Sequence, residues 1–309
     1  MTGRVIVITS GKGGVGKTTT SANIGTALAK EGYKVVLIDT DLGLRNLDLL
    51  LGLENRIVYT IVDVIEERCK LKQALVKDKK NPNLQLLAAA QTRDKSAVSA
   101  DQLKEICETL KEQNDFVLVD CPAGIEQGFQ NAVAGASEAI VVTTPEMSAI
   151  RDADRIIGLL GPKEEITSTK LLLNRVRPSL IKTNEMMSVD DVAEILEIPL
   201  VGIIPEDTGI ITSTNKGDPI VNNEEALAGK AYRNVAQRIL GEEVPYLFCS
   251  SHSITFLRFF YHYLQAMNNT PELKYILAYM SKSLGFTDPM EFVFNKDKQF
   301  IFEDENNDE

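Results

Sequence analysis

The feature that most constrains this chain is a glycine-rich segment near its N-terminus. Residues 11–18 read Gly11-Lys12-Gly13-Gly14-Val15-Gly16-Lys17-Thr18, after an apolar run at 5–8 and before helical apolar spacing at 19–30. This order of strand, glycine loop and helix start matches the pattern G-x-x-x-x-G-K-[ST]. Glycines let successive N–H groups point inward, and the helix N-terminus adds partial positive charge. The segment therefore predicts a phosphate site; the alternative is a glycine turn that only packs.

Two side chains of this loop have predicted roles toward a nucleoside triphosphate. We expect Lys17 to lie along the β and γ phosphates. The Thr18 hydroxyl would complete the coordination shell of a Mg²⁺ ion. The loop thus predicts Mg²⁺ together with a triphosphate.

The rest of the first 240 residues alternates short apolar runs with helical segments. Strands are expected at the apolar runs 35–38, 84–87, 116–119, 139–142, 171–173 and 201–204. Helices are expected at 99–110, 148–160, 189–196 and 224–240. Such alternation is typical of parallel sheets whose crossovers are helices. The prediction is an α/β fold: a doubly wound, mostly parallel sheet with helices on both faces, of the P-loop NTPase type, plus a C-terminal helical extension.

Acidic residues follow two of these strands. Asp39 and Asp41 close the run at 35–38, and Asp120 closes the run at 116–119. Carboxyl ends of parallel strands share one edge of the sheet, so Asp39, Asp120 and Thr18 are expected to hold Mg²⁺ there. Asp120 is the expected supporting acid, with a solvated strand-end carboxylate as the alternative. Either Asp39 or Asp41 could orient the attacking water. We assign this role to Asp41, because residues 42–44 look like a mobile turn.

The loop contains a second lysine, Lys12, that a phosphate loop does not require. A lysine at the start of the loop cannot easily reach the phosphates that Lys17 contacts. It could instead cross a two-fold interface into a partner's nucleotide, as an arginine finger does in trans. The alternative is an exposed surface lysine.

Composition excludes several classes of protein. The chain has 309 residues, 44% hydrophobic and 25% charged, with a net charge of −11, which argues against a nucleic-acid binder. Its four cysteines show no C-x-x-C spacing, which predicts reduced thiols and disfavours an iron–sulfur carrier. No apolar run reaches the roughly 18 residues needed to span a bilayer, and no hydrophobic signal segment precedes the first strand.

Five segments carry a resemblance to a known family. They are G-K-G-G-V-G-K-T at 11–18, D-T-D-L-G-L-R-N-L-D at 39–48, D-C-P-A-G-I-E at 120–126, T-P-E at 144–146 and R-D-A-D-R at 151–155. Together they resemble the MinD family of septum-site-determining ATPases, in the deviant-Walker-A group. The sequences of two segments, L-L-L-G-L-E-N-R and D-C-P-A-G-I-E-Q-G-F-Q-N, are similar to those of the cyanobacterial and plastid branch. The resemblance extends from residue 4 to about 246.

The resemblance implies an ATPase that forms a homodimer when ATP is bound and places the division site of a cell or plastid. It implies that Lys12, Lys17 and Asp41 act in hydrolysis, with Lys12 reaching across the interface. Turnover would be slow unless a partner stimulates it. The residues implied to surround the adenine are Asn174, Arg175, Pro205, Glu206 and Asp207.

The resemblance also implies partners. Asp152 and Asp154 would face a MinC-like inhibitor and a MinE-like activator, although solvated acids on a helix are an equal alternative. Family members end in an amphipathic helix that docks on anionic lipid, and residues 254–265 fit this pattern. The side chains expected in the membrane are Phe256, Leu257, Phe260 and Leu264. The alternative is a helix that packs on the domain.

These expectations define three regions and a location. Residues 1–246 form the ATPase domain, 247–267 a linker with the candidate membrane helix, and 268–309 an extension without a family counterpart. From residue 286 onward, eight acids stand against two lysines, which opposes docking on an anionic surface. We expect a peripheral protein on the inner face of the cell membrane with a cytoplasmic pool, or in the plastid stroma and on the inner envelope.

Two other functions stay open. A ParA-like ATPase would position DNA or another cargo and would bind DNA instead of lipid. For the leading function we expect no specific nucleic-acid partner. A regulated binding module would use ATP mainly as a dimer clamp with negligible turnover.

Overall fold

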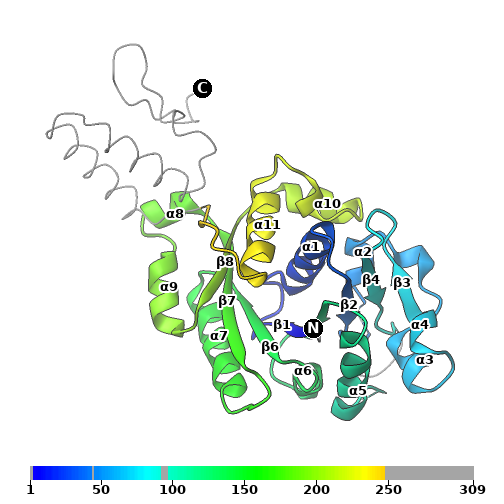
Figure 1. Ribbon diagram of the computed structural model, residues 1–309. Coiled ribbons are helices and arrows are strands. Elements are labelled where there is room, and N and C mark those ends of the chain that lie inside the picture. The colour runs from blue at the N-terminus through cyan, green and yellow to red at the C-terminus, as the bar shows by residue number, and fades with distance from the viewer. Residues whose placement is uncertain (1–2, 44, 92–96, 248–309) are drawn as a thin grey trace, which may run out of the picture. The chain divides into compact units, whose positions relative to one another are not determined.

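The computed structural model describes residues 3–43, 45–91 and 97–247 (Figure 1). The chain divides after Glu242 into two units, and every described helix and strand belongs to the first. The predicted membrane segment at 254–265 and the extension at 268–309 lie outside the described residues. None of the helices in the described ranges combines the length and apolarity needed to cross a membrane.

An eight-stranded sheet forms the centre of the first unit. Its strand order is β3-β4-β2-β5-β1-β6-β7-β8; β3 pairs antiparallel with β4, and every other neighbouring pair is parallel. The strands are β1 (Arg4–Thr9), β2 (Val35–Asp39), β3 (Leu75–Lys77), β4 (Leu84–Leu87), β5 (Phe116–Asp120), β6 (Glu138–Thr143), β7 (Ser168–Val176) and β8 (Leu200–Pro205). The predicted doubly wound, mostly parallel sheet is confirmed.

Helices cover both faces of this sheet (Figure 1). One face carries α1 (Lys17–Lys30), α2 (Leu47–Leu50), α10 (Gly209–Asn215), the 3₁₀ turn η3 (Ile220–Asn222) and α11 (Leu227–Ile239). The opposite face carries α5 (Ala100–Lys111), α6 (Gln127–Val133), α7 (Met147–Leu160) and α9 (Val189–Leu196). The remaining short elements are η1 (Glu54–Arg56), α3 (Ile61–Ile65), α4 (Leu71–Ala74) and α8 (Pro178–Lys182).

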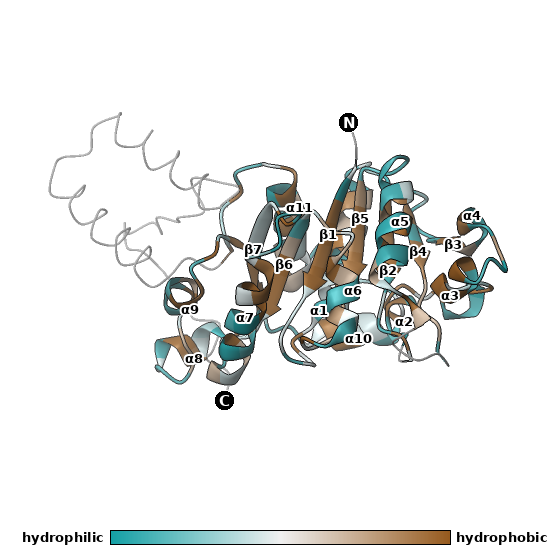
Figure 2. Cartoon of the chain, turned by 90° about the horizontal axis from the view of Figure 1, so that it is seen from below, coloured by the Kyte–Doolittle hydropathy of each residue, from teal (hydrophilic) through white to brown (hydrophobic). Residues whose placement is uncertain are grey.

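The core lies between the sheet and these helices. The strands are apolar on both sides (Figure 2). Helices α5, α7, α9 and α11 each bury one side, whereas α1 is buried around most of its circumference. Helix α5 shows how the sequence directs this: Leu103, Ile106 and Leu110 are buried at helical spacing, and each such burial contributes about 1.5–3 kcal/mol. Ser99 caps the helix by accepting from the Gln102 N–H at 3.3 Å, as its capping-box sequence predicts.

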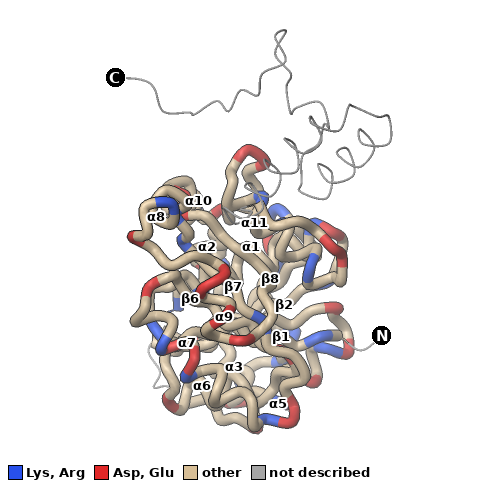
Figure 3. Tube along the Cα trace, turned by 90° about the vertical axis from the view of Figure 1, so that its left-hand side faces the viewer, with Lys and Arg blue, Asp and Glu red and all other residues tan. Residues whose placement is uncertain are grey.

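Charged residues surround the sheet on helices and connecting segments, with both signs interspersed (Figure 3). Three acids depart from this pattern, because Asp39, Asp48 and Asp120 are each only 1% exposed. Asp48 forms an ion pair with Arg45 at 2.8 Å, whereas Asp39 and Asp120 lie at strand ends. Burying a carboxylate without a cation is costly, so strand-end acids of this kind are candidates for a functional position. These two residues direct attention to one edge of the sheet.

The structure differs from the sequence prediction in one strand and in several short elements. The apolar run at 171–173 was expected to end at Asn174, but β7 continues to Val176 with a register shift against β8 after Leu173. Arg175 lies in this irregular stretch with a φ of 55°, a conformation that pairing along a regular strand would not allow. The antiparallel edge strand β3 and the short helices α2, α3, α4, α6, α8 and α10 were not predicted, because elements of three to seven residues carry little periodicity.

Candidate functional site

The loop between β1 and α1 has the backbone of an anion cradle. Gly14 and Gly16 have φ values of 81° and 96°, in the left-handed region where a side chain would be strained. Gly16 precedes α1, and no side chain caps that helix. Among the described residues, no acceptor bonds the N–H groups of Gly13, Gly14 or Gly16, or those of Lys17 and Thr18 in the first turn. These donors fit phosphate oxygens, as the sequence predicted.

Two neighbouring elements hold the loop in this shape. The Asn174 side chain, only 3% exposed, donates to the Val15 carbonyl oxygen at 2.8 Å. A Cβ atom on Gly16 would lie 2.3 Å from Asn174 Nδ2, so only glycine fits there. On the other side, a Cβ atom on Gly11 would lie 2.2 Å from the Asp152 carbonyl oxygen on α7. The loop is therefore packed against both β7 and α7.

The predicted acids meet beside this loop. The parallel register of β2 and β5 places Asp39 opposite Asp120. Ser21 on α1 donates to Asp120 Oδ1 at 2.8 Å. Asp39 accepts from the Asp41 N–H at 2.9 Å and from the Leu47 N–H at 3.3 Å. Strand ends and α1 thus bring together residues that are about 80 to 100 positions apart in the sequence.

Burial raises the pKa of both carboxyl groups. The pKa of Asp39 rises from 3.8 to about 7, because burial and the Asp120 charge disfavour its ionised form. The pKa of Asp120 rises from 3.8 to about 6 through burial, although hydrogen bonds from Ser21 and Thr18 and the nearby Lys17 ammonium oppose the rise. The pKa values of both acids stay raised even with the Lys17 ammonium nearby, and a divalent cation would supply the further positive charge that favours their ionised forms.

The donor set fits Mg²⁺ in particular. Among the residues described, no group of three or more His, Cys, Asp and Glu side chains forms an all-protein metal site. Mg²⁺ commonly takes one or two carboxylate or hydroxyl ligands and completes its shell with phosphates and waters. Thr18, Asp39 and Asp120 at the mouth of a phosphate loop match that mode of binding.

The two lysines of the loop occupy different environments. Lys17 is 8% exposed and lies close enough to Asp120 to lower the pKa of that carboxyl group. Lys12 is directed away from the loop: its Nζ donates to Ser148 Oγ at 3.0 Å and lies 3.8 Å from Glu146 Oε2. The Lys12 side chain remains 44% exposed. Only Lys17 therefore belongs to the phosphate cradle of its own chain.

The residues implied to surround the adenine lie at the ends of β7 and β8. Pro205 at the end of β8 pairs in register with Val176, and the Glu206 N–H donates to the Val176 carbonyl oxygen at 3.0 Å. Asn174 contacts the phosphate loop, and Arg175 follows it at the surface. The structure therefore brings these segments together beside the loop.

Two of these acids have partners within the chain. Glu206 forms an ion pair with Arg177, and the hydrogen bond from that guanidinium lowers the pKa of Glu206. The Asp207 carboxylate accepts from the Gly209 N–H at 2.7 Å and from the Ala228 N–H at 3.3 Å. Asp207 thus holds the first turns of α10 and α11, a role that the sequence prediction did not include.

The implied partner surface lies on α7. This helix buries its apolar side against β6, which leaves Asp154 exposed and Asp152 half-buried. Because the Asp152 backbone contacts Gly11, α7 is in direct contact with the phosphate loop. The residues predicted for the membrane, Phe256, Leu257, Phe260 and Leu264, lie outside the described part of the chain.

Sequence reasoning missed Ser21 and Arg177. Ser21 lies four residues after Lys17 on α1, so both occupy the same side of the helix. That spacing could have predicted a hydroxyl directed at the strand-end acids. Arg177 carried no such signal, because its partner Glu206 is 29 residues away.

Comparison with known proteins identifies a family. The family described as "CobQ/CobB/MinD/ParA nucleotide binding domain" matches residues 6–220. The chain is 58% identical over 252 residues to the septum site-determining protein MinD of Synechocystis, covering 81% of this chain and 94% of that protein. It is 58% identical over 244 residues to MinD of Bacillus subtilis, covering 79% and 91%. It is 57% identical over 251 residues to a putative MinD of Guillardia theta, covering 81% and 93%.

Solved structures give the same result. The fold is similar to the MinD cell division protein of Aquifex aeolicus, with a TM-score of 0.73 and 49% identity over 79% of this chain and 99% of that one. A chain in the MinC:MinD complex of the same organism gives a TM-score of 0.73 and 50% identity, over 78% of this chain and 97% of that one. MinD of Pyrococcus horikoshii, solved with Mg-ADP, gives a TM-score of 0.70 and 32% identity, over 76% of this chain and 95% of that one.

Proposed function

This chain belongs to the septum site-determining MinD family of nucleotide-binding proteins, and from that membership we propose that it is a Mg²⁺-dependent ATPase that dimerises with ATP and places the division site from a membrane. The observation that carries the proposal is the pairing of Asp39 with Asp120 beside the cradle that contains Lys17. A site that only bound phosphate would need the loop alone. Buried acids at its mouth add the groups that hydrolysis requires.

Each residue of the site has a distinct task in the proposed hydrolysis. The N–H groups of the loop bind the phosphates, and the Lys17 ammonium stabilises the charge that develops on them. Thr18, Asp39 and Asp120 hold Mg²⁺, which neutralises phosphate charge when it is bound. Asp41 accepts a hydrogen bond from the attacking water and so orients the water toward the γ phosphate of ATP, from which ADP departs. Support for Asp41 comes from its position, two residues beyond Asp39 on the same edge of the sheet.

Dimerisation is proposed from the position of Lys12. Its side chain is 44% exposed and, within the described residues, its ammonium contacts Ser148 and Glu146 at the start of α7, so it is available to a second copy of the chain. In a two-fold dimer, each Lys12 would contact the nucleotide of the partner chain. The site is then completed only by a second ATP-bound copy, and we expect slow turnover until a partner stimulates it.

The proposed partners follow from relatives. The solved complex of Aquifex aeolicus contains MinC together with MinD, and we propose a MinC-like inhibitor for this chain as well. Asp152 and Asp154 on α7 are the proposed contacts for it and for a MinE-like activator. Support comes from the packing of α7 against Gly11, which links this surface to the nucleotide loop.

We also propose that residues 254–265 bind an anionic membrane through Phe256, Leu257, Phe260 and Leu264. A weak anchor becomes effective when a dimer presents two copies, because the second binds at a high local concentration. ATP binding would then recruit the protein to the inner face of the cell membrane, or to the inner plastid envelope in a plastid. Hydrolysis would return it to the cytoplasm or stroma.

Vesicle pelleting tests this function. We expect the full chain to sediment with anionic vesicles in ATP and not in ADP. Lys12→Ala and truncation after residue 253 should each abolish sedimentation, while Lys104→Ala, which removes an exposed lysine on α5, should leave it unchanged. Sedimentation that is indifferent to the nucleotide contradicts the proposal.

Two further assays separate the alternatives. A salt-sensitive, ATP-dependent shift of DNA would support a ParA-like cargo ATPase instead. Single-turnover hydrolysis, measured with and without a partner, would identify a binding module if ATP stays intact in both. Either result is compatible with nucleotide binding and would replace the proposal that ATP hydrolysis controls membrane binding.

A further inference from the structure

Ser21 is a polar residue at a fully buried position on α1. At other buried positions of this helix, where a small side chain suffices, the chain has alanine, as at Ala22, Ala27 and Ala29. Serine is the poorer helix former of the two, and a buried hydroxyl needs a hydrogen-bond partner. Packing alone would therefore favour alanine at position 21, so the hydroxyl is expected to serve another purpose.

The Ser21 hydroxyl has two acceptors within reach. Its Oγ lies 3.1 Å from the Lys17 carbonyl oxygen and 2.8 Å from Asp120 Oδ1. A hydroxyl has one proton, so it donates to only one of them at a time. Helix geometry already directs the Ser21 N–H at the Lys17 carbonyl oxygen, whereas the carboxylate is closer and charged, which makes it the stronger acceptor. The Ser21 hydroxyl therefore donates to Asp120.

This hydrogen bond constrains the orientation of the Asp120 carboxylate. The Cβ–Cγ torsion of an aspartate has a broad energy profile, so the backbone of β5 does not fix the plane of the carboxylate. Ser21 holds Oδ1 toward α1, and the Thr18 side chain, one turn earlier on the same side of the helix, also hydrogen-bonds this carboxylate. Because Ser21 and Asp120 are both buried, water does not replace a lost bond there. Helix α1 thus holds the carboxylate at two points.

The orientation of Asp120 matters for the cation. Thr18 and Asp120 belong to the Mg²⁺ site proposed above, whereas Ser21 contacts that site only through Asp120. Groups that hold the ligands of a metal ion in place typically change its affinity about 10- to 100-fold when they are removed. We propose that Ser21 is a positioning residue for Mg²⁺: it holds the Asp120 carboxylate in the orientation that the cation requires, without contacting the cation itself. This role rests on the proposed Mg²⁺ site.

A positioning role and a merely structural role predict different results. If Ser21 only ties α1 to β5, its removal should disturb the phosphate loop at the start of α1 and weaken ADP binding with or without Mg²⁺. If Ser21 acts through Asp120, its removal should weaken only the part of the ADP affinity that Mg²⁺ adds. This part is the ratio of the ADP dissociation constants in EDTA and in Mg²⁺, which we call the Mg²⁺ gain.

Titration calorimetry of ADP on the full chain, once in excess Mg²⁺ and once in EDTA, measures the Mg²⁺ gain. Ser21→Ala removes the hydroxyl, and alanine suits a helix, so α1 should stay folded in this variant. We expect the Mg²⁺ gain of Ser21→Ala to be about tenfold smaller than that of the wild type. The affinity for ADP in EDTA should be unchanged.

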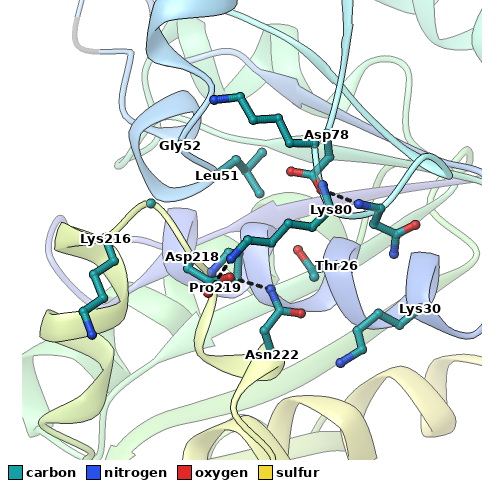
Figure 4. Close-up of a pocket in the computed structure, with 13 residues that line it drawn as sticks. Thr26, Lys30, Leu51, Gly52, Asp78, Lys80, Lys216, Asp218, Pro219 and Asn222 are labelled. Carbon is teal, nitrogen blue, oxygen red and sulfur yellow. Dashed lines mark hydrogen bonds and ion pairs between the residues drawn. The ribbon is translucent and has the colours of Figure 1, made fainter.

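The matched control is Thr26→Val, which removes another buried hydroxyl from α1 and keeps the shape of the side chain. The Thr26 hydroxyl donates to the Ala22 carbonyl oxygen at 2.7 Å, four residues earlier, as Ser21 could do toward its own helix. Thr26 lies in the half of α1 away from the phosphate loop, where it lines a hollow with Lys80 and Asp218 (Figure 4). The Mg²⁺ gain of Thr26→Val should equal that of the wild type.

Two results overturn the role of Ser21 and leave the Mg²⁺ site in place. The first is a Mg²⁺ gain in Ser21→Ala that equals the gain in Thr26→Val. The second is a loss of ADP affinity in Ser21→Ala that is the same in EDTA and in Mg²⁺, which would make Ser21 a structural tie. A wild-type chain without any Mg²⁺ gain would instead overturn the proposed Mg²⁺ site, and the role of Ser21 with it.

Discussion

Replacing Asp39 by asparagine tests whether the buried acid is a site for a cation. Without ligand, a rise in the pKa of Asp39 from 3.8 to about 7 corresponds to a destabilisation of roughly 4 kcal/mol once the group is ionised. The substituted asparagine would carry no charge, but it would present one oxygen instead of two to the N–H groups of Asp41 and Leu47. The lost hydrogen bond costs about 1 kcal/mol. At pH 8 the variant should therefore be more stable by roughly 3 kcal/mol.

The dependence on pH follows from proton binding. The folded chain holds the Asp39 proton more tightly than the unfolded chain does, so the contribution of Asp39 to stability is most favourable below pH 3.8 and is lost as the pH rises to about 7. Asparagine does not titrate. The advantage of Asp39→Asn should thus be absent near pH 4, grow between pH 4 and 7, and stay constant above.

Urea unfolding of the nucleotide-free chain at several pH values measures this difference. As a control, Glu164→Gln removes an exposed carboxylate from a loop and should change the unfolding free energy by less than about 0.5 kcal/mol. Adding Mg-ADP should reverse the order, because the wild type gains more from the bound cation. A nucleotide-free variant that is less stable than the wild type at pH 8, or a difference that does not vary with pH, refutes the reasoning.

Two further predictions concern the packing around the loop. Gly11→Ala places a methyl group 2.2 Å from the Asp152 carbonyl oxygen and should destabilise the chain by about 3 kcal/mol in thermal unfolding. The control Gly13→Ala, whose new methyl group would have only a 3.9 Å contact, should unfold like the wild type. Equal melting temperatures of the two variants would disprove the packing of Gly11 against α7. Asn174→Ala leaves the Val15 carbonyl oxygen without its donor and should weaken ADP binding about tenfold, as measured by calorimetry. An unchanged affinity for ADP would show that Asn174 does not hold the loop.

The sequence predicted the fold wherever an element was long enough to show periodicity. The parallel strands are buried on both sides and read as short apolar runs, and the limits of α9 were predicted to the residue from its Ser188 cap. Between residues 47 and 77 the elements are short and packed at the edge of the sheet, so local spacing carries no signal. Contacts with the rest of the domain stabilise them instead.

The sequence alone determined the phosphate loop and the two strand-end acids, because glycine conformation and strand polarity are local properties. Only the tertiary structure decided which of these residues meet. It separated Lys12 from Lys17 and paired Asp39 with Asp120. It also gave the Asp207 carboxylate two backbone N–H donors, from Gly209 and Ala228. These outcomes depend on contacts between residues far apart in the chain, which the order of residues within one segment does not encode.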